Sequence, residues 1–405
     1  FFFFQAEDGI RDVDMSRGLG DVYKRQVFTA CLIYFQGPFG GLAVMTVLPV
    51  LKESFLIGID LIALAVTLNG LILGSMQLIA GMLSDRFGRK KIITIGLVFY
   101  IIGTAVTSTV TTFWEYLLTR TIQGFGDGMI NSVTVALAGD IVSEKDRGKV
   151  MGALSTSLSL ALALGPLFGG FVASFSWRWI FVTMSCFGIV NLFLLITVFR
   201  GVKEAYIQHN TGSILSQLKI AFRNKIIVIL ALLSLIMGFG RLALFTYLPD
   251  TLSQPEYAFS SVEIGYAMFL ASLGGIFASP LTGYLLDALG RLKTVMIGFL
   301  AFITSLFTFA FLDLLSYWIY LTFYFGFSIA IFQTALQTIT ADVSDETRGT
   351  NLSLVLAVMF TGSSTAPLIL VPIYQVYGLV GVTTFCGFLV LLGFFAFLPF
   401  RKNIG

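Results

Sequence analysis

The chain has 405 residues, of which 57% are hydrophobic and only 12% are charged, with a formal net charge of +3 and a mean hydropathy of +0.91. Soluble domains carry roughly 25% charged residues, so this composition excludes a water-soluble globule of this size. The apolar residues form blocks of about the ~20 residues that a helix needs to cross a bilayer. Because backbone groups in lipid must pair within their own segment, the sequence predicts an all-α membrane protein.

The first residues differ from the rest of the chain. Residues 1–26 are polar and charged after Phe1–Phe4, and the stretches 5–12 and 16–26 are similar to translated sequencing-library adapter. We expect 1–26 to be a non-native segment, with a disordered tail as the alternative, and we leave it out of the predicted fold.

Twelve apolar blocks follow in chain order. The first six are 27–51, 61–83, 92–112, 116–141, 150–174 and 178–199. After a polar stretch, six more are 225–249, 262–285, 294–312, 317–342, 350–373 and 379–399. The sequence therefore predicts 12 transmembrane helices: an N-terminal six-helix half at 27–199, a central loop at 200–224 and a C-terminal six-helix half at 225–405.

Basic residues are distributed unequally between the loops. One set of loops holds most of them, whereas the opposite set holds only Lys52 and Arg178. Because lysine and arginine favour the cytoplasmic side, we expect both termini and the central loop to be cytoplasmic. We expect a monomeric, multi-pass protein of the cytoplasmic (inner) membrane, with the lipid bilayer as its surroundings and no nucleic-acid partner.

The two halves repeat each other. The segment 81–89 returns at 283–291, and Asp140 follows Arg89 at the same spacing as Asp342 follows Arg291. Since each half has six spans, the repeat is parallel. In transporters built from two such halves, the substrate site lies between them near the membrane midplane.

Three motifs carry a family resemblance. Residues 81–90 match the signature Gly-x-x-x-Asp-Arg-x-Gly-Arg-[Arg/Lys], and the chain from 27 onward resembles the major facilitator superfamily; the second copy departs at Ala288. Residues 120–126 match the family's Arg-x-x-Gln-Gly-x-Gly, and 165–170 resemble the antiporter motif of its twelve-span drug:proton antiporters. The resemblance implies a secondary active transporter that works by alternating access.

Acidic and basic residues gather at one membrane edge in both copies. Arginine can bridge two carboxylates, so such a cluster would act as a gate if it closed and opened between the halves; the alternative is a helix cap. Gly81 and Gly88 would allow close approach. The candidate gate residues are Gly81, Asp85, Arg86, Gly88, Arg89, Asp140, Asp287, Arg291 and Asp342.

The antiporter motif places small residues and a proline in the fifth span. Small residues let membrane helices pack closely, and proline bends a helix. The resemblance implies that Gly165, Pro166, Gly169 and Gly170 seal the cavity against leak. Packing alone is the alternative.

Three charges inside the spans are absent from the repeat. At an offset of 202 residues, Arg120, Asp127 and Arg241 correspond to Thr322, Ile329 and Phe39. Ionisable groups in a membrane are costly and point to function. Arg120 and Asp127 share a helix face but are ~10 Å apart along it, so we expect them to line a common cavity without touching.

A carboxylate in surroundings of low dielectric constant binds a proton more readily than one in water, so Asp127 is suited to take up and release a proton. The family resemblance implies a role in proton coupling for Arg120 as well. The structural alternatives are an Arg120 that snorkels and an Asp127 with a fixed partner. The first span has no acidic residue, unlike many drug:proton exporters. Further cavity candidates are Gln36, Asn69, Gln77, Asn131, Asn191, Gln333 and Gln337.

These features favour proton-coupled export of small amphipathic compounds, including cationic ones, driven by the proton gradient and without a cofactor. One alternative is a carrier of organic anions or metabolites that uses Arg120 and Arg241; a second is a non-transporting membrane sensor. An enzyme is not expected, because the sequence offers no nucleophile–base pair, metal-ligand cluster or phosphate loop, and only one histidine, His209.

Overall fold

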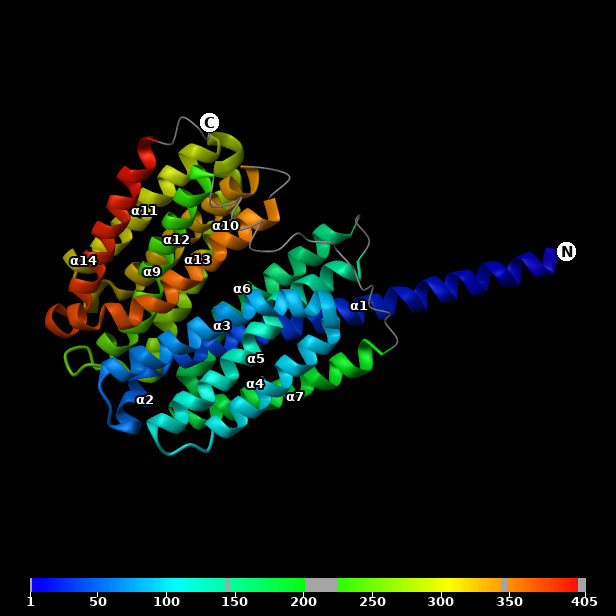
Figure 1. The fold of residues 1–405 in the computed structure, drawn as a ribbon, viewed down its shortest axis with the longest axis horizontal. Coiled ribbons are helices and arrows are strands. Elements are labelled where there is room, and N and C mark those ends of the chain that lie inside the picture. The colour runs from blue at the N-terminus through cyan, green and yellow to red at the C-terminus, as the bar shows by residue number, and fades with distance from the viewer. Residues whose placement is uncertain (1, 143–145, 201–223, 344–347, 400–405) are drawn as a thin grey trace.

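The computed structural model describes residues 2–142, 146–200, 224–343 and 348–399, without the side chains of 2–22, 342, 348–350 and 353. The described residues form thirteen helices, labelled as in Figure 1. Those of the N-terminal half are α1 (Phe2–Thr46), α2 (Leu48–Phe55), α3 (Ile59–Phe87), α4 (Arg89–Thr107), α5 (Phe113–Asp140), α6 (Arg147–Ala173) and α7 (Arg178–Val198).

The C-terminal half repeats this order of long helices. It contains α9 (Lys225–Leu252), α10 (Ser261–Leu289), α11 (Arg291–Phe311), α12 (Leu314–Asp342), α13 (Arg348–Ile369) and α14 (Val371–Phe397). In the described part of the chain, 10 helices are long and apolar enough to cross a membrane. With α5 and α13 they account for the twelve predicted spans, which confirms the predicted fold class.

The equivalent turns of the two halves have the same backbone geometry. Gly88 joins α3 to α4 with φ 95°, and Gly290 joins α10 to α11 with φ 82°. These are left-handed conformations in which a side chain is strained. Each glycine N–H donates to the carbonyl four residues earlier, at 3.0 Å to Ser84 and 3.2 Å to Leu286. The glycine of the repeated motif is therefore required by the turn.

Two predicted spans are interrupted. The first breaks at Val47, after which α2 begins with Pro49 in its first turn, since proline fits there without losing a backbone hydrogen bond. In α14, Gly378 has non-helical angles (φ 61°, ψ −157°), so the helix bends immediately before the predicted start of the twelfth span at 379.

Residues 2–26 form the first part of α1. The backbone is helical from Phe2 onward without a break, and Figure 1 shows this part projecting beyond the bundle. The alternative of a disordered tail therefore differs from the backbone described here. The origin of the segment stays a prediction.

The two halves lie side by side around one buried apolar cluster that draws on helices of both. We call the end of the bundle with α2 and the loop 253–260 the α2 end, and the opposite end, with Gly88 and Gly290, the Arg89 end. Figure 1 shows the helices of the two halves splayed apart from the α2 end.

Candidate functional site

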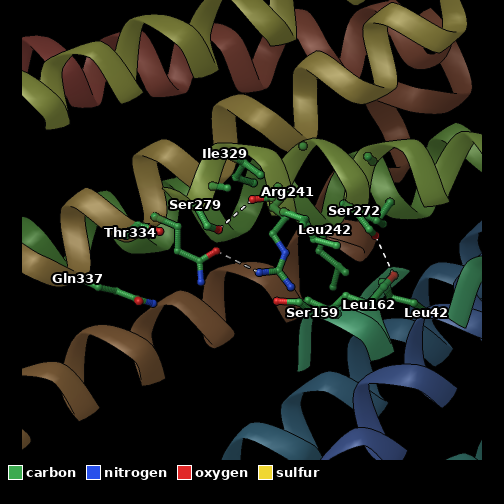
Figure 2. A pocket seen from close by; sticks show the side chains of 17 residues that line it. Leu42, Ser159, Leu162, Arg241, Leu242, Ser272, Ser279, Ile329, Thr334 and Gln337 are labelled. Carbon is green, nitrogen blue, oxygen red and sulfur yellow. Dashed lines mark hydrogen bonds between the residues drawn. The ribbon is translucent and has the colours of Figure 1, made fainter. Parts of the chain in front are cut away.

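A cavity of about 230 Å³ lies between the two halves (Figure 2). The N-terminal half contributes Leu42 of α1 and two residues of α6, and the C-terminal half contributes the rest. This is the position expected from the parallel repeat. The lining residues are Leu42, Ser159, Leu162, Arg241, Leu242, Phe245, Ala271, Ser272, Gly275, Ile276, Ser279, Gly326, Ile329, Ala330, Gln333, Thr334 and Gln337.

Small residues bring α10 and α12 together along one wall of the cavity. A Cβ at Gly326 would overlap the backbone of Ala271, and one at Gly274 would overlap the Phe323 carbonyl oxygen. Gln333 and Gln337 lie seven and eleven residues after Gly326, so they share its helix face. The close packing therefore directs both amides into the cavity, and their contact with a substrate stays a prediction.

Arg241 carries the only charge among the lining residues. Its Nη1 donates to Gln333 Oε1 at 3.5 Å, a long contact that leaves most of the five guanidinium donors for a ligand or water. Figure 2 shows the guanidinium pointing toward Ser159 on α6. No carboxylate is among the lining residues, so the cavity is suited to a hydrogen-bond acceptor or an anionic group more than to a cation.

Arg120 is not among the residues that line this cavity. It is 5% exposed and donates to Gln123 Oε1 and, at 3.3 Å, to Asn69 Oδ1, while the Asn69 amide donates to the Arg120 carbonyl at 2.8 Å. Its guanidinium also lies 5.8 Å from the centre of the Phe181 ring. Arg120, Gln123 and Asn69 thus form a polar network inside the N-terminal half.

Asp127 is also buried in the N-terminal half, outside the lining of the cavity. It is 5% exposed, and its Oδ1 has no hydrogen-bond partner among the described residues. A Cβ at Gly37 of α1 would lie 2.7 Å from this oxygen and 3.1 Å from the Asn131 amide nitrogen. Asp127 therefore faces the α1 backbone, and the expected common cavity with Arg120 stays a prediction.

Gln36 of α1 and Asn191 of α7 form a second buried polar contact. The Asn191 amide donates to Gln36 Oε1 at 2.6 Å, whereas the Gln36 amide nitrogen and Asn191 Oδ1 have no partner among the described residues. Asn131 Oδ1 is likewise without one. Buried polar groups usually have hydrogen-bond partners, so these polar side chains beside α1 form a second candidate polar site within the half.

Three candidate gate residues of the N-terminal half, Asp85, Arg89 and Asp140, contact one another. Arg89 pairs with Asp85 at 2.6 Å and with Asp140 at 3.0 Å, and it donates to Ser84 Oγ at 2.6 Å. The cluster joins α3, α4 and α5. These contacts all lie within one half, so a gate between the halves stays a prediction.

Other gate candidates lie elsewhere. Arg86 stacks at 5.3 Å over the Phe87 ring. A Cβ at Gly81 would meet nothing within 4 Å, so the close approach expected there is wrong, because the α3 surface at Gly81 is open. Asp287 and Arg291 are exposed at the Arg89 end, and the side chain of Asp342 lies outside the described residues.

The antiporter motif packs backbone against backbone. A Cβ at Gly165 would come within 2.5 Å of the Phe39 carbonyl oxygen, and one at Gly169 would overlap the Ala43 carbonyl oxygen, both on α1. Gly170 faces the other half instead, where a Cβ would overlap the Ser261 carbonyl oxygen and lie 3.0 Å from Gly265 Cα. The motif thus holds α6 against α1 and against α10 at the α2 end.

The hydroxyl groups that line the cavity were not predicted from the sequence. Ser272 Oγ donates to the Leu162 carbonyl at 2.8 Å across the halves, and Ser159, Ser279 and Thr334 also line the cavity. Serine and threonine are common in membrane helices as packing residues, so their presence in the sequence gives no signal of a site. Only their position beside Arg241 does.

Twelve spans in two repeated halves, with an amphipathic cavity between them, define a membrane transport protein. Residues 30–367 and 251–403 match the Major Facilitator Superfamily. The chain belongs to this superfamily, and it is a transporter rather than an enzyme, as predicted.

Relatives and solved structures agree with this assignment. The "Uncharacterized MFS-type transporter YceJ" of Bacillus subtilis (strain 168) is 27% identical over 331 residues, 81% of this chain and 84% of that protein. "Multidrug resistance protein 3" of the same organism is 33% identical over 123 residues, 30% of this chain and 24% of its own length. The crystal structure of the nucleoside transporter NupG has a TM-score of 0.80 at 14% identity and covers 93% of this chain and 99% of its own, which shows the same fold.

Proposed function

We propose that this protein exports small amphipathic compounds across the cytoplasmic membrane in exchange for protons, by alternating access, with the Arg89 end in the cytoplasm. The observation that carries the proposal is the cavity between the halves. It combines apolar side chains such as Leu42, Leu162 and Phe245 with the polar groups of Arg241 and Gln333. Such a mixture binds a molecule with an apolar body and one polar end. The partial likeness to a multidrug resistance protein supports the same substrate class.

Asp127 is the proposed proton site. A carboxylate with an unpartnered oxygen, buried among helices, is better stabilised in its neutral form, so proton binding and release would accompany a change in its surroundings. Gly37 of α1 covers this oxygen, and α1 also supplies Leu42 to the cavity. A movement of α1 would therefore couple the proton site to the substrate site.

Organic anions are a second candidate substrate class. The specific observation in favour is that Arg241 is the only charged residue lining the cavity and no carboxylate opposes it. Arginine binds carboxylates and phosphates through paired hydrogen bonds. An amphipathic anion belongs to both proposed substrate classes. A cationic drug, by contrast, would place its positive charge beside the Arg241 guanidinium, which would repel it.

Flux in proteoliposomes tests the proposal. Purified protein is reconstituted, a proton gradient is imposed, and uptake of amphipathic anions, neutral compounds and cations is compared with that of protein-free liposomes. We expect gradient-driven transport that Asp127→Asn abolishes and Asp146→Asn, a surface carboxylate of the same half, leaves intact. Transport that survives Asp127→Asn with its gradient dependence would contradict the proton site. Ligand binding without flux of any class would favour a sensor.

A further inference from the structure

An ion pair joins the two halves at the α2 end. Lys52 of α2 donates through Nζ to Asp250 Oδ1 of α9, in the other half. The Lys52 side chain is 28% exposed and that of Asp250 only 4%. The pair therefore has one accessible and one buried member, and separating the halves at this end separates the charges.

The Asp250 carboxylate is held on its other side by the C-terminal half. Its Oδ2 accepts from the Tyr374 hydroxyl at 2.8 Å, and this hydroxyl accepts from the Gln254 amide at 3.2 Å. The Tyr374 ring stacks on Tyr247 with centroids 4.4 Å apart. Because Asp250 stays fixed in its own half, removal of Lys52 would leave a buried carboxylate without its counter-charge, which is unfavourable.

Neither charge belongs to the repeated scaffold. At the repeat offset of 202 residues, Lys52 corresponds to Gln254 and Asp250 to Leu48. The pair is thus an addition to one end of the molecule. By contrast, the Asp85–Arg89–Asp140 cluster at the opposite end makes its described contacts inside one half.

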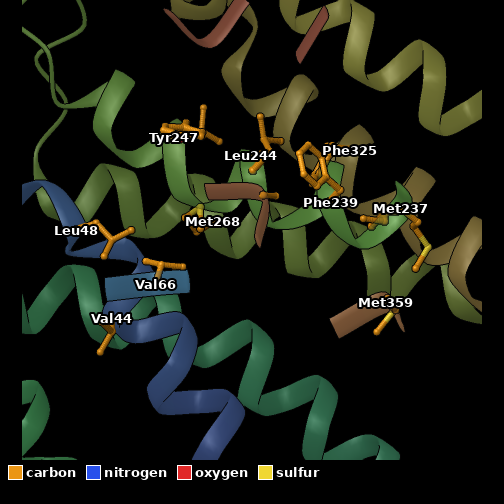
Figure 3. Packing of buried hydrophobic residues seen from close by; sticks show 14 of the residues in the cluster. Val44, Leu48, Val66, Met237, Phe239, Leu244, Tyr247, Met268, Phe325 and Met359 are labelled. Atoms are coloured by element: carbon orange, nitrogen blue, oxygen red, sulfur yellow. The ribbon is translucent and has the colours of Figure 1, made fainter. Parts of the chain in front are cut away.

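The contacts around the pair are apolar and close. Leu48 and Val66 of the N-terminal half share a buried cluster with Met268 and Tyr247 of the C-terminal half (Figure 3). Nearby, the backbones of α6 and α10 meet at Gly170 and Gly265. The halves are therefore in contact at the α2 end while they splay apart toward the Arg89 end (Figure 1).

We propose that Lys52, Asp250 and Tyr374 form a latch that keeps the α2 end closed and that opens when the cavity is exposed to that side. This inference rests on the proposed alternating access. A packed interface of this kind has discrete arrangements, and the latch favours the one in which the α2 end is shut. Lys52 and Asp250 thereby act as positioning residues for the two halves and make no contact with substrate.

Distances between spin labels on the two halves test the latch without any need for transport. Cysteines replace Asp60 of α3 and Glu256 of the loop 253–260, both exposed, in protein from which Cys31, Cys186 and Cys386 have been removed. The label-to-label distance distribution is measured in nanodiscs without substrate or gradient.

We expect a dominant short distance that shifts toward longer values in Lys52→Met and in Asp250→Asn, and less so in Tyr374→Phe. The exchange of charges, Lys52→Asp with Asp250→Lys, should restore the short distance. Lys149→Met is the matched control, because it breaks the exposed Lys149–Asp146 pair inside one half and should leave the distribution unchanged.

An unchanged distribution in Lys52→Met and Asp250→Asn would overturn the latch. So would a charge exchange that stays at the long distance while its circular dichroism and size-exclusion profile match the parent protein, and this variant keeps the test decisive if Asp250→Asn fails to fold. If the distance shifts in the latch variants but the parent protein shows no proton-driven flux in the proteoliposome assay, the latch is retained and the proposed export is rejected. If the parent protein shows flux but the distance does not shift in the variants, the proposed export is retained and the latch is rejected.

Discussion

At Arg241, the guanidinium faces the cavity with one long contact to Gln333. A charge-assisted hydrogen bond contributes about 1.5–3 kcal/mol, so Arg241→Gln should weaken binding of an amphipathic anion roughly ten- to a hundredfold. Arg241→Lys should retain part of the affinity. Titration of the ligand against purified protein measures both, with Lys149→Met as a variant far from the cavity. Equal affinity of Arg241→Gln and parent protein would contradict an anion site here.

Arg89 lies at a partly exposed edge, where its carboxylate partners Asp85 and Asp140 are 56% and 36% exposed. Exposed ion pairs contribute only about 0–1 kcal/mol, so Asp140→Asn should change the melting temperature little. If the cluster is a gate, the same variant should slow flux several-fold. Thermal unfolding and proteoliposome flux, measured on the same preparation, separate the two roles. A large decrease in melting temperature, with normal flux of the folded fraction, would show that the cluster only stabilises the fold and is not a gate.

Single residues also show where prediction from the sequence reached its limit. The repeat identified Arg241 as an exception to the scaffold, and the structure places it in the cavity with Gln333 and Gln337. The same offset, applied to Lys52 and Asp250, would have singled out the latch. The helical period predicted that Arg120 and Asp127 lie on one face of their helix. It did not predict which residues pack against that face, because these residues belong to α1 and α3, which are distant in sequence.

At the scale of the helix, the antiporter motif makes different contacts at adjacent positions. Gly169 abuts α1 in its own half, whereas Gly170 abuts α10 in the other half. Overpacking of a tight contact costs about 1–3 kcal/mol. We expect Gly169→Ala to lower the melting temperature, and Gly170→Ala to lengthen the distance between labels at positions 60 and 256.

Gly152 provides the matched control within the same helix, since a Cβ there would meet nothing within 4 Å. Gly152→Ala should leave both measurements unchanged or raise stability slightly, because alanine is the better helix former by about 0.8–1 kcal/mol. If Gly152→Ala and Gly170→Ala behave alike, the contact across the halves has no influence on opening.

The apolar blocks predicted the approximate position of the long helices, and capping and turn residues mark several helix ends in the structure. Thr112 with Glu115 and Ser260 with Glu263 form capping boxes at the starts of α5 and α10, and glycines end α3 and α10. The breaks at Val47 and Gly378 did not follow, because apolar composition continues through both. Hydropathy reports whether a segment is apolar but not where its backbone changes direction.

At the scale of the whole molecule, the repeat and the family signature sufficed for the architecture, whereas the contact between the halves did not follow from them. Because the repeat is parallel, its symmetry axis runs along the membrane normal and does not relate the two ends, so symmetry does not decide which end closes. In our proposal, two contacts keep the α2 end closed: the unrepeated Lys52–Asp250 pair and the backbone contact of α6 with α10 at Gly170 and Gly265. According to this proposal, a few residues outside the repeat determine which arrangement of the duplicated scaffold is favoured.

The orientation of the molecule in the membrane depends on its basic residues taken together. The loops at the Arg89 end carry most of the lysines and arginines, whereas those at the α2 end carry Lys52 and Arg178. Both of these are engaged by the protein, Lys52 by Asp250 and Arg178 by the backbone carbonyls of Ser108 and Val110. Because lysine and arginine favour the cytoplasmic side, this distribution favours the proposed orientation, with the Arg89 end in the cytoplasm.

Labelling of single cysteines tests this orientation in cells that express the protein without its three native cysteines. Glu256→Cys should react with an impermeant maleimide before permeabilisation. Lys91→Cys, at the opposite end, should react only afterwards, and the parent without cysteines supplies the background. The reverse order of labelling would place the latch in the cytoplasm and turn the proposed direction of export around.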